Sequence, residues 1–328
     1  MIQRRDVVII THAGRSIGGG HASRCSALAE GFASFGVPVR WLVNAPAGEI
    51  VMSRGGAESF VSVIESPFDA GADEVFSALS RFRPSLCVVD GYDASPQFLG
   101  ELRQLSPVVL VDDCRVWPVE RECDVVLNYN LNAELLGYAR GYAELLLGPE
   151  YCLLRSEFWS LAPEKGDGIL IIPGASDLLN VGEQFAEWWR SDWPRAELVL
   201  GPLVERSTVE HLSEVVQILP NFSVIHNPPD LPARMARSRA VLCTSSVTSY
   251  EALALRKPLV VFQTAENQIG IGREIERRGL GTNLGFWRTW GAFELEKALS
   301  HISTAPGPGG VHPKGSQAAA KAILDVLT

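Results

Sequence analysis

Short apolar runs alternate with longer amphipathic stretches along the whole chain, and this alternation predicts strands connected by helices. In the first half, the expected strands are 6–11, 39–43, 60–64, 86–89, 108–111 and 124–128, with helices near 21–35, 72–81, 95–104 and 131–139. In the second half, the expected strands are 169–172, 197–200, 223–225, 240–243 and 259–262, with helices near 179–190, 208–217, 230–237, 246–255, 268–278 and 316–327. Such alternation is typical of parallel sheets with helices on both faces.

The alternation is interrupted once, at residues 159–168, which read as a linker. We therefore predict two α/β domains, 1–158 and 159–328, each a doubly wound Rossmann-like sheet, with a central cleft between them. In sheets of this kind, ligands bind beyond the carboxyl ends of the strands. Most of the candidate residues below follow predicted strands, while Tyr151 and Arg155 lie at the junction of the two domains.

Composition narrows the class of protein. The chain has 328 residues, of which 46% are hydrophobic, and a formal charge of −9. The negative charge argues against nucleic acid and anionic membranes as partners. No apolar run has the length of a signal-peptide core or a membrane span. The six cysteines are scattered, with no metal-ligand spacing, and are expected to be reduced thiols of a cytoplasmic protein that needs no metal and no cofactor. A monomer is favoured.

The most informative motif lies between the first predicted strand and the first predicted helix. Three glycines, 18–20, precede His21. Glycines at such a turn let a ligand approach the backbone closely, since no Cβ stands in the way. The positive end of the helix dipole disfavours a protonated imidazole at His21. The motif therefore predicts a general base close to an anion-friendly turn.

Two other interpretations of this motif stay open at this point. A dinucleotide fingerprint needs a third glycine and an acidic residue after the second strand. Ser23 and Asn44 stand at those places, so a dehydrogenase is disfavoured. His21 is also compatible with a simple helix-capping role.

Further polar residues follow the later strands of the first half. Asp90 and Tyr92 follow the strand at 86–89, and Asp112 and Asp113 follow the strand at 108–111. Asp often serves as a loop or helix-cap residue at such places. These positions are therefore candidates for either substrate contact or capping.

In the second half, the hydroxyl-rich segment 244–249 opens a predicted helix. Backbone N–H groups and hydroxyls at Ser245, Ser246 and Val247 would form a diphosphate cradle without a metal, and Glu251 would accept hydrogen bonds from a ribose. Asn267 and Gln268 offer amides for sugar hydroxyls or acetamido groups. The alternative interpretation is that a serine of this segment only caps the helix and that Glu251 is a surface residue.

Eight short motifs in this order resemble a known family. They are Ile17-Gly-x-Gly-His21-x-x-Arg24, Val89-Asp-x-Tyr92, Asp112-Asp113, Cys123-Asp-x-x-Leu-Asn128, Gly148-x-x-Tyr151-x-Leu-Leu-Arg155, Ser176-Asp177-x-x-Asn180, Ser246-x-x-x-x-Glu251 and Glu266-Asn267-Gln268. The set resembles the UDP-2,4-diacetamido-2,4,6-trideoxy-β-L-altropyranose hydrolases of pseudaminic acid biosynthesis. The likeness covers residues 7 to 280.

The resemblance implies a glycosyltransferase-B-like fold and hydrolysis of a UDP-linked sugar to free sugar and UDP. The family's catalytic histidine falls on His21, and its substrate-binding asparagine on Asn267. Three departures concern the sugar. His12 stands where the family commonly has Asp, Gly174-Ala175-Ser176 replaces Gly-Gly-Ser/Thr, and Ser245-Ser-Val-Thr stands where many members have a Gly-Ser-Thr-type segment.

The motifs together yield one set of predicted site residues. His21 is the catalytic residue. The predicted substrate contacts are Gly19, Gly20, Arg24, Asp90, Tyr92, Tyr151, Arg155, Asp177, Asn180, Asn267 and Gln268, and the predicted nucleotide contacts are Gly174, Ser245, Ser246, Val247 and Glu251.

The expected reaction is a single, inverting attack of water at the anomeric carbon, with His21 as base and UDP as the leaving group. Two alternatives remain. One is a glycosyltransferase-B-type enzyme that passes the sugar to an acceptor, and the other is a non-catalytic subunit that binds nucleotide sugars. Release of UDP without an acceptor distinguishes the three.

Overall fold

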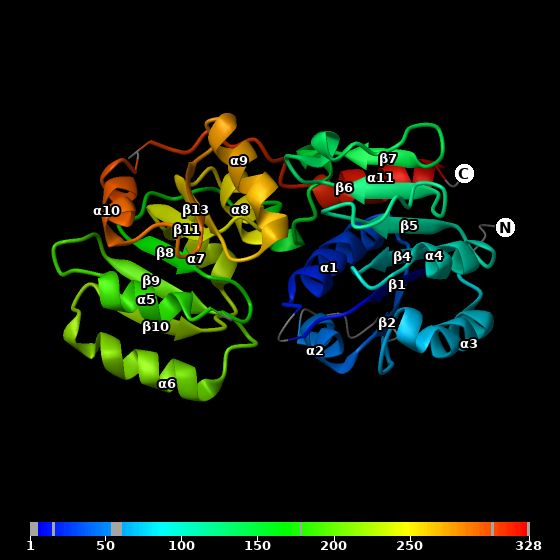
Figure 1. The fold of residues 1–328 in the computed structure, drawn as a ribbon, viewed down its shortest axis with the longest axis horizontal. Helices are drawn as coiled ribbons and strands as arrows, with labels where there is room; N and C mark the ends of the chain where they lie inside the picture. The colour runs from blue at the N-terminus through cyan, green and yellow to red at the C-terminus, as the bar shows by residue number, and fades with distance from the viewer. Residues whose placement is uncertain (1–5, 15–16, 54–60, 178, 303–304, 327–328) are drawn as a thin grey trace. The chain divides into compact units, whose positions relative to one another are not determined.

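The computed structural model describes residues 6–14, 17–53, 61–177, 179–302 and 305–326. The chain divides into two compact units: Met1–Ser156 with Lys314–Thr328, and Glu157–Pro313. Each unit is built on its own parallel β-sheet flanked by helices (Figure 1). The predicted fold class, two doubly wound α/β domains, is confirmed.

The first unit contains a sheet with the strand order β3-β2-β1-β4-β5-β6-β7 among the described residues. Its strands are β1 Val7–Thr11, β2 Val39–Val43, β3 Val61–Val63, β4 Leu86–Asp90, β5 Val108–Val111, β6 Val125–Asn128 and β7 Glu144–Leu147. Its α-helices are α1 Gly20–Ala33, α2 Ala45–Ser53, α3 Ala72–Phe82, α4 Pro96–Arg103 and α11 Gly315–Val326. The sequence prediction missed β7 and α2.

The order of the strands reverses between β1 and β4, and the register there brings two strand ends together. Thr11 pairs with Asp90, and the Thr11 hydroxyl donates to the Asp90 carbonyl oxygen at 2.9 Å. All five residues of β1 are buried, as expected for a central strand with helices on both faces. A switch point of this kind is where open α/β sheets bind ligands.

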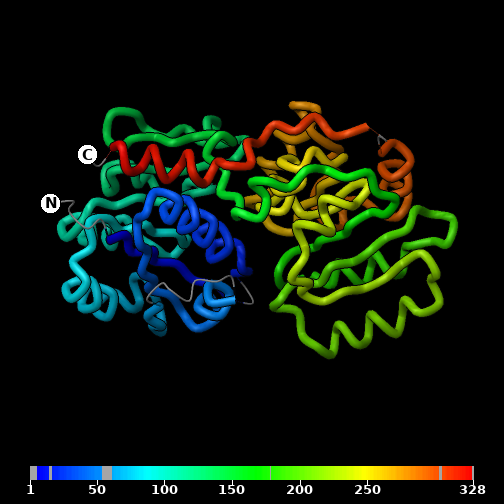
Figure 2. The backbone as a smooth tube through the Cα atoms, turned by 180° about the vertical axis from the view of Figure 1, so that it is seen from behind, coloured from blue at the N-terminus to red at the C-terminus, as the bar shows by residue number. Residues whose placement is uncertain are grey.

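The last helix, α11, belongs to the first unit, whereas the sequence had suggested a second domain that extends to residue 328. It lies beside α1 (Figure 2). The approach is close at Gly31, where an added Cβ would lie 2.3 Å from the carbonyl oxygen of Ser316. The Ser316 hydroxyl donates to the Leu154 carbonyl oxygen at 2.6 Å. A helix pattern in the sequence indicates an apolar face but not the sheet that the face covers.

The second unit has the strand order β10-β9-β8-β11-β12-β13 among the described residues. Its strands are β8 Ile169–Ile172, β9 Ala196–Leu200, β10 Phe222–His226, β11 Ala240–Thr244, β12 Leu259–Gln263 and β13 Thr282–Phe286. Its α-helices are α5 Val181–Trp188, α6 Arg206–Val215, α7 Leu231–Arg237, α8 Val247–Ala254, α9 Ile269–Arg277 and α10 Ala292–Ser300. The prediction missed β13 and α10.

Candidate active site

In the first unit, an acidic and basic cluster occupies the carboxyl ends of β1, β4 and β5 and the first turn of α1. Its central members are His21, Arg24, Asp90 and Asp113. His21 and Arg24 are one helical turn apart, so they lie on the same face of α1. That face meets the strand ends, and the cluster forms there.

The centre of the cluster is a close pair formed by His21 and Asp90. The His21 Nδ1 atom lies 2.6 Å from the Asp90 Oδ1 atom. Burial works against the charged carboxylate, yet Arg24 and His21 hold the pKa of Asp90 far below its ordinary value. An ionised carboxylate only accepts hydrogen bonds, so the tautomer with the proton on Nδ1 donates to Asp90 and keeps the Nε2 lone pair. Arg24 Nη2 lies 3.0 Å from the same Nδ1 atom. A histidine in that tautomer, oriented by a carboxylate, is arranged as a general base.

Arg24 neutralises both carboxylates of the cluster. Its Nε and Nη2 atoms donate to the two oxygens of Asp90 at 2.7 and 2.6 Å, and its Nη1 atom donates to Asp113 Oδ2 at 2.7 Å. Burial opposes the charge on Arg24, but the two carboxylates raise the pKa of its guanidinium above the usual value. The sequence prediction had assigned Arg24 to substrate. In the structure, three of its N–H groups serve the protein itself.

Tyr92 contacts both Asp113 and the proposed base, His21. Its hydroxyl donates to Asp113 Oδ2 at 2.9 Å, and its ring lies edge-on to the His21 ring with centroids 4.8 Å apart. The Cys25 thiol, 3.3 Å from Asp90 Oδ2, completes the shell around that carboxylate. The imidazole of His21 is therefore fixed both by its hydrogen bond and by packing.

His12 is a second buried histidine beside the base. It is 5% exposed, its ring centroid lies 5.5 Å from that of His21, and Phe68 packs edge-on against it at 4.8 Å. Burial, together with the nearby His21, lowers the pKa of His12. Within the described part of the chain, its Nε2 atom has no hydrogen-bond partner. The sequence marked His12 as a departure from the family motif and, with Asp90, as the next candidate base after His21.

The glycine turn before α1 shows why His21 is not a cap. Gly19 is the N-cap residue, and His21 lies inside the first turn. Gly18 has a φ of +82°, a conformation that favours glycine. Among the described residues, no atom lies within 4 Å of a Cβ added at Gly20. The predicted ligand contacts of Gly19 and Gly20 stay predictions.

In the second unit, the matching feature is the start of α8, after β11. Ser246 is the N-cap, and its own side chain makes no capping hydrogen bond. The hydroxyls of Thr244 and Ser246 lie 2.9 Å apart. Uncapped N–H groups and hydroxyls at a helix N-terminus suit an anion, so the predicted nucleotide contacts of Ser246 and Val247 keep their physical basis. Glu251 is 5% exposed, and its ribose contact stays a prediction.

Ser245 plays a different part from its neighbours. Its side chain is fully buried, donates to the Gln268 carbonyl oxygen at 2.9 Å and accepts from Gln263 Nε2 at 3.1 Å. This hydroxyl ties β11 to β12 and to the segment that follows it. Gln268 is also engaged, since its Oε1 atom accepts from the Thr264 N–H at 2.9 Å.

Asp177 and Asn180 shape the start of α5. The two oxygens of Asp177 accept from the backbone N–H groups of Val181 and Gly182 at 2.8 and 2.9 Å. Burial raises the pKa of Asp177 to about 6. Asn180 is the N-cap, with a φ of +52°. Capping accounts for both residues, and their contacts with substrate stay predictions.

Four further predicted contacts have local settings of their own. Gly174 has a φ of +122°, with nothing within 4 Å of an added Cβ. Tyr151 ends the 3-10 helix Pro149–Tyr151, which packs against α11, and Arg155 follows it in the first unit. Asn267 lies in the 3-10 helix Glu266–Gln268 of the second unit. Their ligand contacts remain predictions.

One group of described residues has donor atoms spaced for a metal ion: Asp112, Asp113 and Cys114 have one such atom each within 4.8 Å of the others. Their carboxylates already have partners, except that Asp113 Oδ1 has none among the described residues. Asp113 accepts from Arg24 and Tyr92, while Asp112 accepts from the Tyr138 hydroxyl at 2.7 Å and from two backbone N–H groups. This arrangement is typical of carboxylates that stabilise a loop, here the loop after β5. The expected metal independence stays a prediction.

Comparison with known proteins identifies the fold. No protein-family model matches the chain, and no curated protein matches it. Among solved structures, the glycotransferase of kitacinnamycin is similar at a TM-score of 0.67 and 15% identity, over 99% of this chain and 100% of that chain. The spinosyn rhamnosyltransferase SpnG in complex with thymidine diphosphate is similar at 0.64 and 17%, over 98% and 96%.

A third similar structure is the UDP-GlcNAc 2-epimerase of Methanocaldococcus jannaschii in complex with UDP-GlcNAc and UDP, at a TM-score of 0.65 and 12% identity, over 98% and 99%. Together with the two parallel sheets, these likenesses define the class: the chain has the glycosyltransferase-B fold. At such identities the likeness extends to the fold alone. Among the described residues, no helix has both the length and the apolar character to cross a membrane.

Proposed function

We propose that this protein is an enzyme that cleaves the glycosidic bond of a nucleoside-diphosphate sugar, with His21 as the general base. The observation that carries the proposal is the 2.6 Å contact between His21 Nδ1 and Asp90. It supports the tautomer with the proton on Nδ1, in which Nε2 can accept a proton. Asp90, held ionised by Arg24, then stabilises the imidazolium that forms.

The reaction follows from that arrangement. His21 Nε2 accepts the proton of an attacking hydroxyl while its oxygen forms a bond to the anomeric carbon. The bond from that carbon to the diphosphate oxygen breaks, and the nucleoside diphosphate leaves with the electron pair. A single displacement inverts the configuration at the anomeric carbon. Nucleoside diphosphates are good leaving groups, so a base contributes more than an acid would.

The attacking hydroxyl belongs either to an acceptor molecule or to water. Transfer to an acceptor is the form we favour, since two of the similar structures are named as a glycotransferase and a rhamnosyltransferase. Hydrolysis is the second candidate, favoured by the eight motifs that resemble UDP-diacetamido-trideoxy-sugar hydrolases of pseudaminic acid biosynthesis. Both forms use the same base.

The nucleotide is assigned to the start of α8 in the second unit. The uncapped N–H groups after Ser246 and the paired hydroxyls of Thr244 and Ser246 support this assignment. A helix N-terminus stabilises the charge of a departing diphosphate. UDP is the nucleotide we expect.

The test is release of UDP from UDP-sugars, UDP-GlcNAc and UDP-2,4-diacetamido-trideoxy sugars among them, with and without methyl glycosides as acceptors. Release that requires an acceptor supports transfer, and release in water alone supports hydrolysis. Bound UDP without release from any of these sugars, in either condition, contradicts the catalytic proposal and leaves a binding protein.

A further inference from the structure

A buried amide at the end of β12 connects three neighbouring strands of the second unit. Gln263 is the last residue of β12 and is 2% exposed. Its Nε2 atom donates to Ser245 Oγ at 3.1 Å and to Asn283 Oδ1 at 2.7 Å. Ser245 directly follows β11, and Asn283 lies in β13. Both hydrogens of the side-chain amide are therefore used inside the protein.

From Ser245 the hydrogen bonds continue into the segment that follows β12. The Ser245 hydroxyl donates to the Gln268 carbonyl oxygen at 2.9 Å, and Gln268 Oε1 accepts from the Thr264 N–H at 2.9 Å. Asn267, a predicted sugar contact, lies between these two ends, in the 3-10 helix Glu266–Gln268. The residues joined in this way form the Gln263 network: Gln263, Ser245, Asn283, Gln268 and Thr264.

Helix α9 packs directly over the amide because Gly272 has no side chain. A Cβ added at Gly272 would lie 2.3 Å from Gln263 Nε2 and 3.1 Å from Asn283 Oδ1. The register of β12 against β13 shifts between Val261 and Gln263, and the Gln263 carbonyl oxygen accepts from the Trp287 N–H at 2.7 Å. The side chain and the backbone of Gln263 are thus both fixed by hydrogen bonds.

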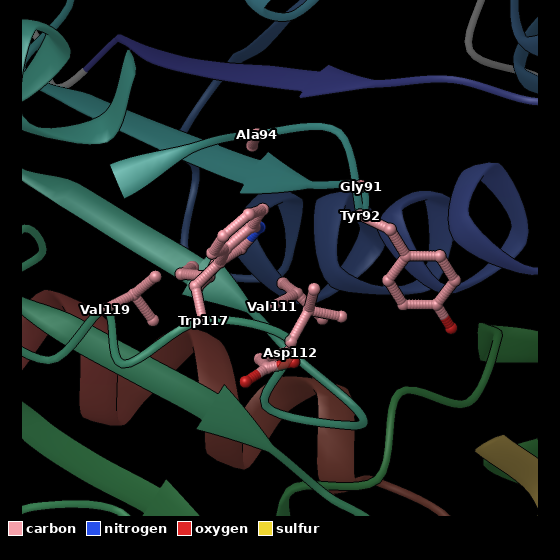
Figure 3. A pocket seen from close by; sticks show the side chains of 9 residues that line it. Gly91, Tyr92, Ala94, Val111, Asp112, Trp117 and Val119 are labelled. Atoms are coloured by element: carbon pink, nitrogen blue, oxygen red, sulfur yellow. The ribbon is translucent and has the colours of Figure 1, made fainter. Parts of the chain in front are cut away.

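The small hollow at the ends of β4 and β5 in the first unit is no alternative place for the sugar. Figure 3 shows the side chains that line it, with Tyr92, Asp112 and Trp117 among them. It has about 20 Å³ of enclosed space, which holds a water molecule but no sugar ring. The position of the sugar therefore depends on other residues, which include the predicted contacts Asn267 and Gln268.

We propose that Gln263 is a positioning residue of the nucleotide-sugar site, which sets where the segment Glu266–Gln268 lies relative to the start of α8. This role rests on the proposed function, which assigns the diphosphate to the start of α8. Ser245, which precedes the N-cap of that helix, is the link between the two ligand-binding elements. Gln263 itself touches no ligand, so the affinity for the sugar depends on it indirectly.

The test is Gln263→Met, which keeps the length of the side chain but removes both donors. Without them the Ser245 hydroxyl can turn to its other acceptor, the Phe262 carbonyl oxygen at 3.4 Å. Calorimetric titration of the full chain measures the affinity for UDP, for UDP-GlcNAc and for a UDP-2,4-diacetamido-trideoxy sugar. Binding of at least one UDP-sugar should weaken by about tenfold, while the UDP affinity stays within about twofold of wild type.

Hydrogen exchange gives a readout that needs no ligand. The Thr264 amide is bonded to the Gln268 side chain and should exchange about tenfold faster in Gln263→Met than in the wild type. The matched control is Gln217→Met, which replaces an exposed glutamine of the same unit and should leave exchange and both affinities unchanged. A role in stability alone would not change the ratio of UDP-sugar affinity to UDP affinity.

A second variant, Gly272→Ala, displaces the amide of Gln263 without removal of a polar group. It should reproduce the pattern of Gln263→Met and carries the test if that variant does not fold. Its matched control is Gly48→Ala in α2, where the atom nearest to an added Cβ is an ordinary contact at 3.5 Å.

Two results overturn the positioning role and leave the proposed function standing. One is UDP-sugar affinity and Thr264 exchange in both variants equal to those of the wild type, and the other is loss of UDP and UDP-sugar affinity by the same factor. A wild type that binds UDP but neither UDP-sugar also overturns the role. A wild type that binds neither UDP nor a UDP-sugar contradicts the proposed function itself, and the role of Gln263 with it.

Discussion

The two units place different chemistry at the same position of the same fold. In each, the strand order reverses beside the first strand of the unit, and polar residues follow the strand ends there. In the first unit these residues are charged and bound to one another, with Arg24 between Asp90 and Asp113. In the second unit they are neutral hydroxyls and amides at the start of α8. A charged, fixed cluster suits proton transfer, while an uncapped helix start suits an anion.

The largest expected effect is on stability. Asp90→Ala leaves the buried Arg24 without its main partner and should lower the free energy of unfolding by about 3–5 kcal/mol. Ser245→Ala, at the equivalent place in the second unit, breaks neutral hydrogen bonds and should cost about 1–3 kcal/mol. Urea denaturation of both variants measures the difference. Equal losses of unfolding free energy in the two variants would mean that the charge of the first cluster adds nothing to its stability relative to the neutral hydrogen bonds of the second unit.

A smaller effect is expected on nucleotide binding. Glu251→Ala should weaken UDP affinity by about 1–3 kcal/mol if its carboxylate binds the ribose. The wild type should show a rise in melting temperature with UDP, and this rise should shrink in the variant. Glu214→Ala, an exposed glutamate of α6 in the same unit, is the control. UDP affinity unchanged in Glu251→Ala would move the ribose contact elsewhere.

The charged cluster of the first unit should contribute to the acid sensitivity of the protein. Burial opposes the charged forms, but Arg24 lowers the pKa values of Asp90 and Asp113 in the folded state. The unfolded chain then binds more protons, so stability is fully present above the unfolded pKa of about 3.9 and falls as the pH drops below it. Urea denaturation at a series of pH values between 7 and 3 gives the free energy of unfolding as a function of pH. This dependence should be less steep in Asp113→Asn than in the wild type. The exposed Asp167→Asn should follow the wild type, and a wild-type slope in Asp113→Asn would refute this account.

The smallest effect concerns metals. Asp112 and Asp113 already accept hydrogen bonds from Tyr138, Arg24 and Tyr92, so the rate of UDP release should be unchanged in excess chelator. Loss of activity that magnesium or manganese restores would show instead that these carboxylates, or others, hold an ion during turnover.

Much of the fold was predictable because buried strands leave a local signal. β1 and β5 are runs of Val, Ile and Leu with few interruptions, and their bounds were found to within a residue. The edge strand β13 is broken by Asn283 and Gly285 and lacks such a run, and β7 has only three consecutive leucines, too few to distinguish a strand from a helix. Both were missed. The helix α2 contains Pro46 and Gly48, which weaken its pattern.

The site was only partly predictable. The glycine turn and the helix start pointed to His21, and Arg24 was selected as part of the motif that carries the family resemblance. The pairing of His21 with Asp90, and the use of Arg24 to hold two carboxylates, depend on the alignment of β1 with β4. That alignment is a long-range property. The same limit applies to Ser245, whose hydroxyl faces inward because β12 lies beside it.

The measurement that tests the central claim most directly is UDP release by His21→Asn compared with the wild type, at a UDP-sugar concentration that saturates both. Asn keeps a polar side chain at this position but cannot accept a proton at neutral pH. The account predicts that turnover falls by about 10²–10⁴-fold while the UDP affinity and the melting temperature stay close to the wild-type values. Turnover near the wild-type rate in a folded, UDP-binding variant would show that His21 is not the base.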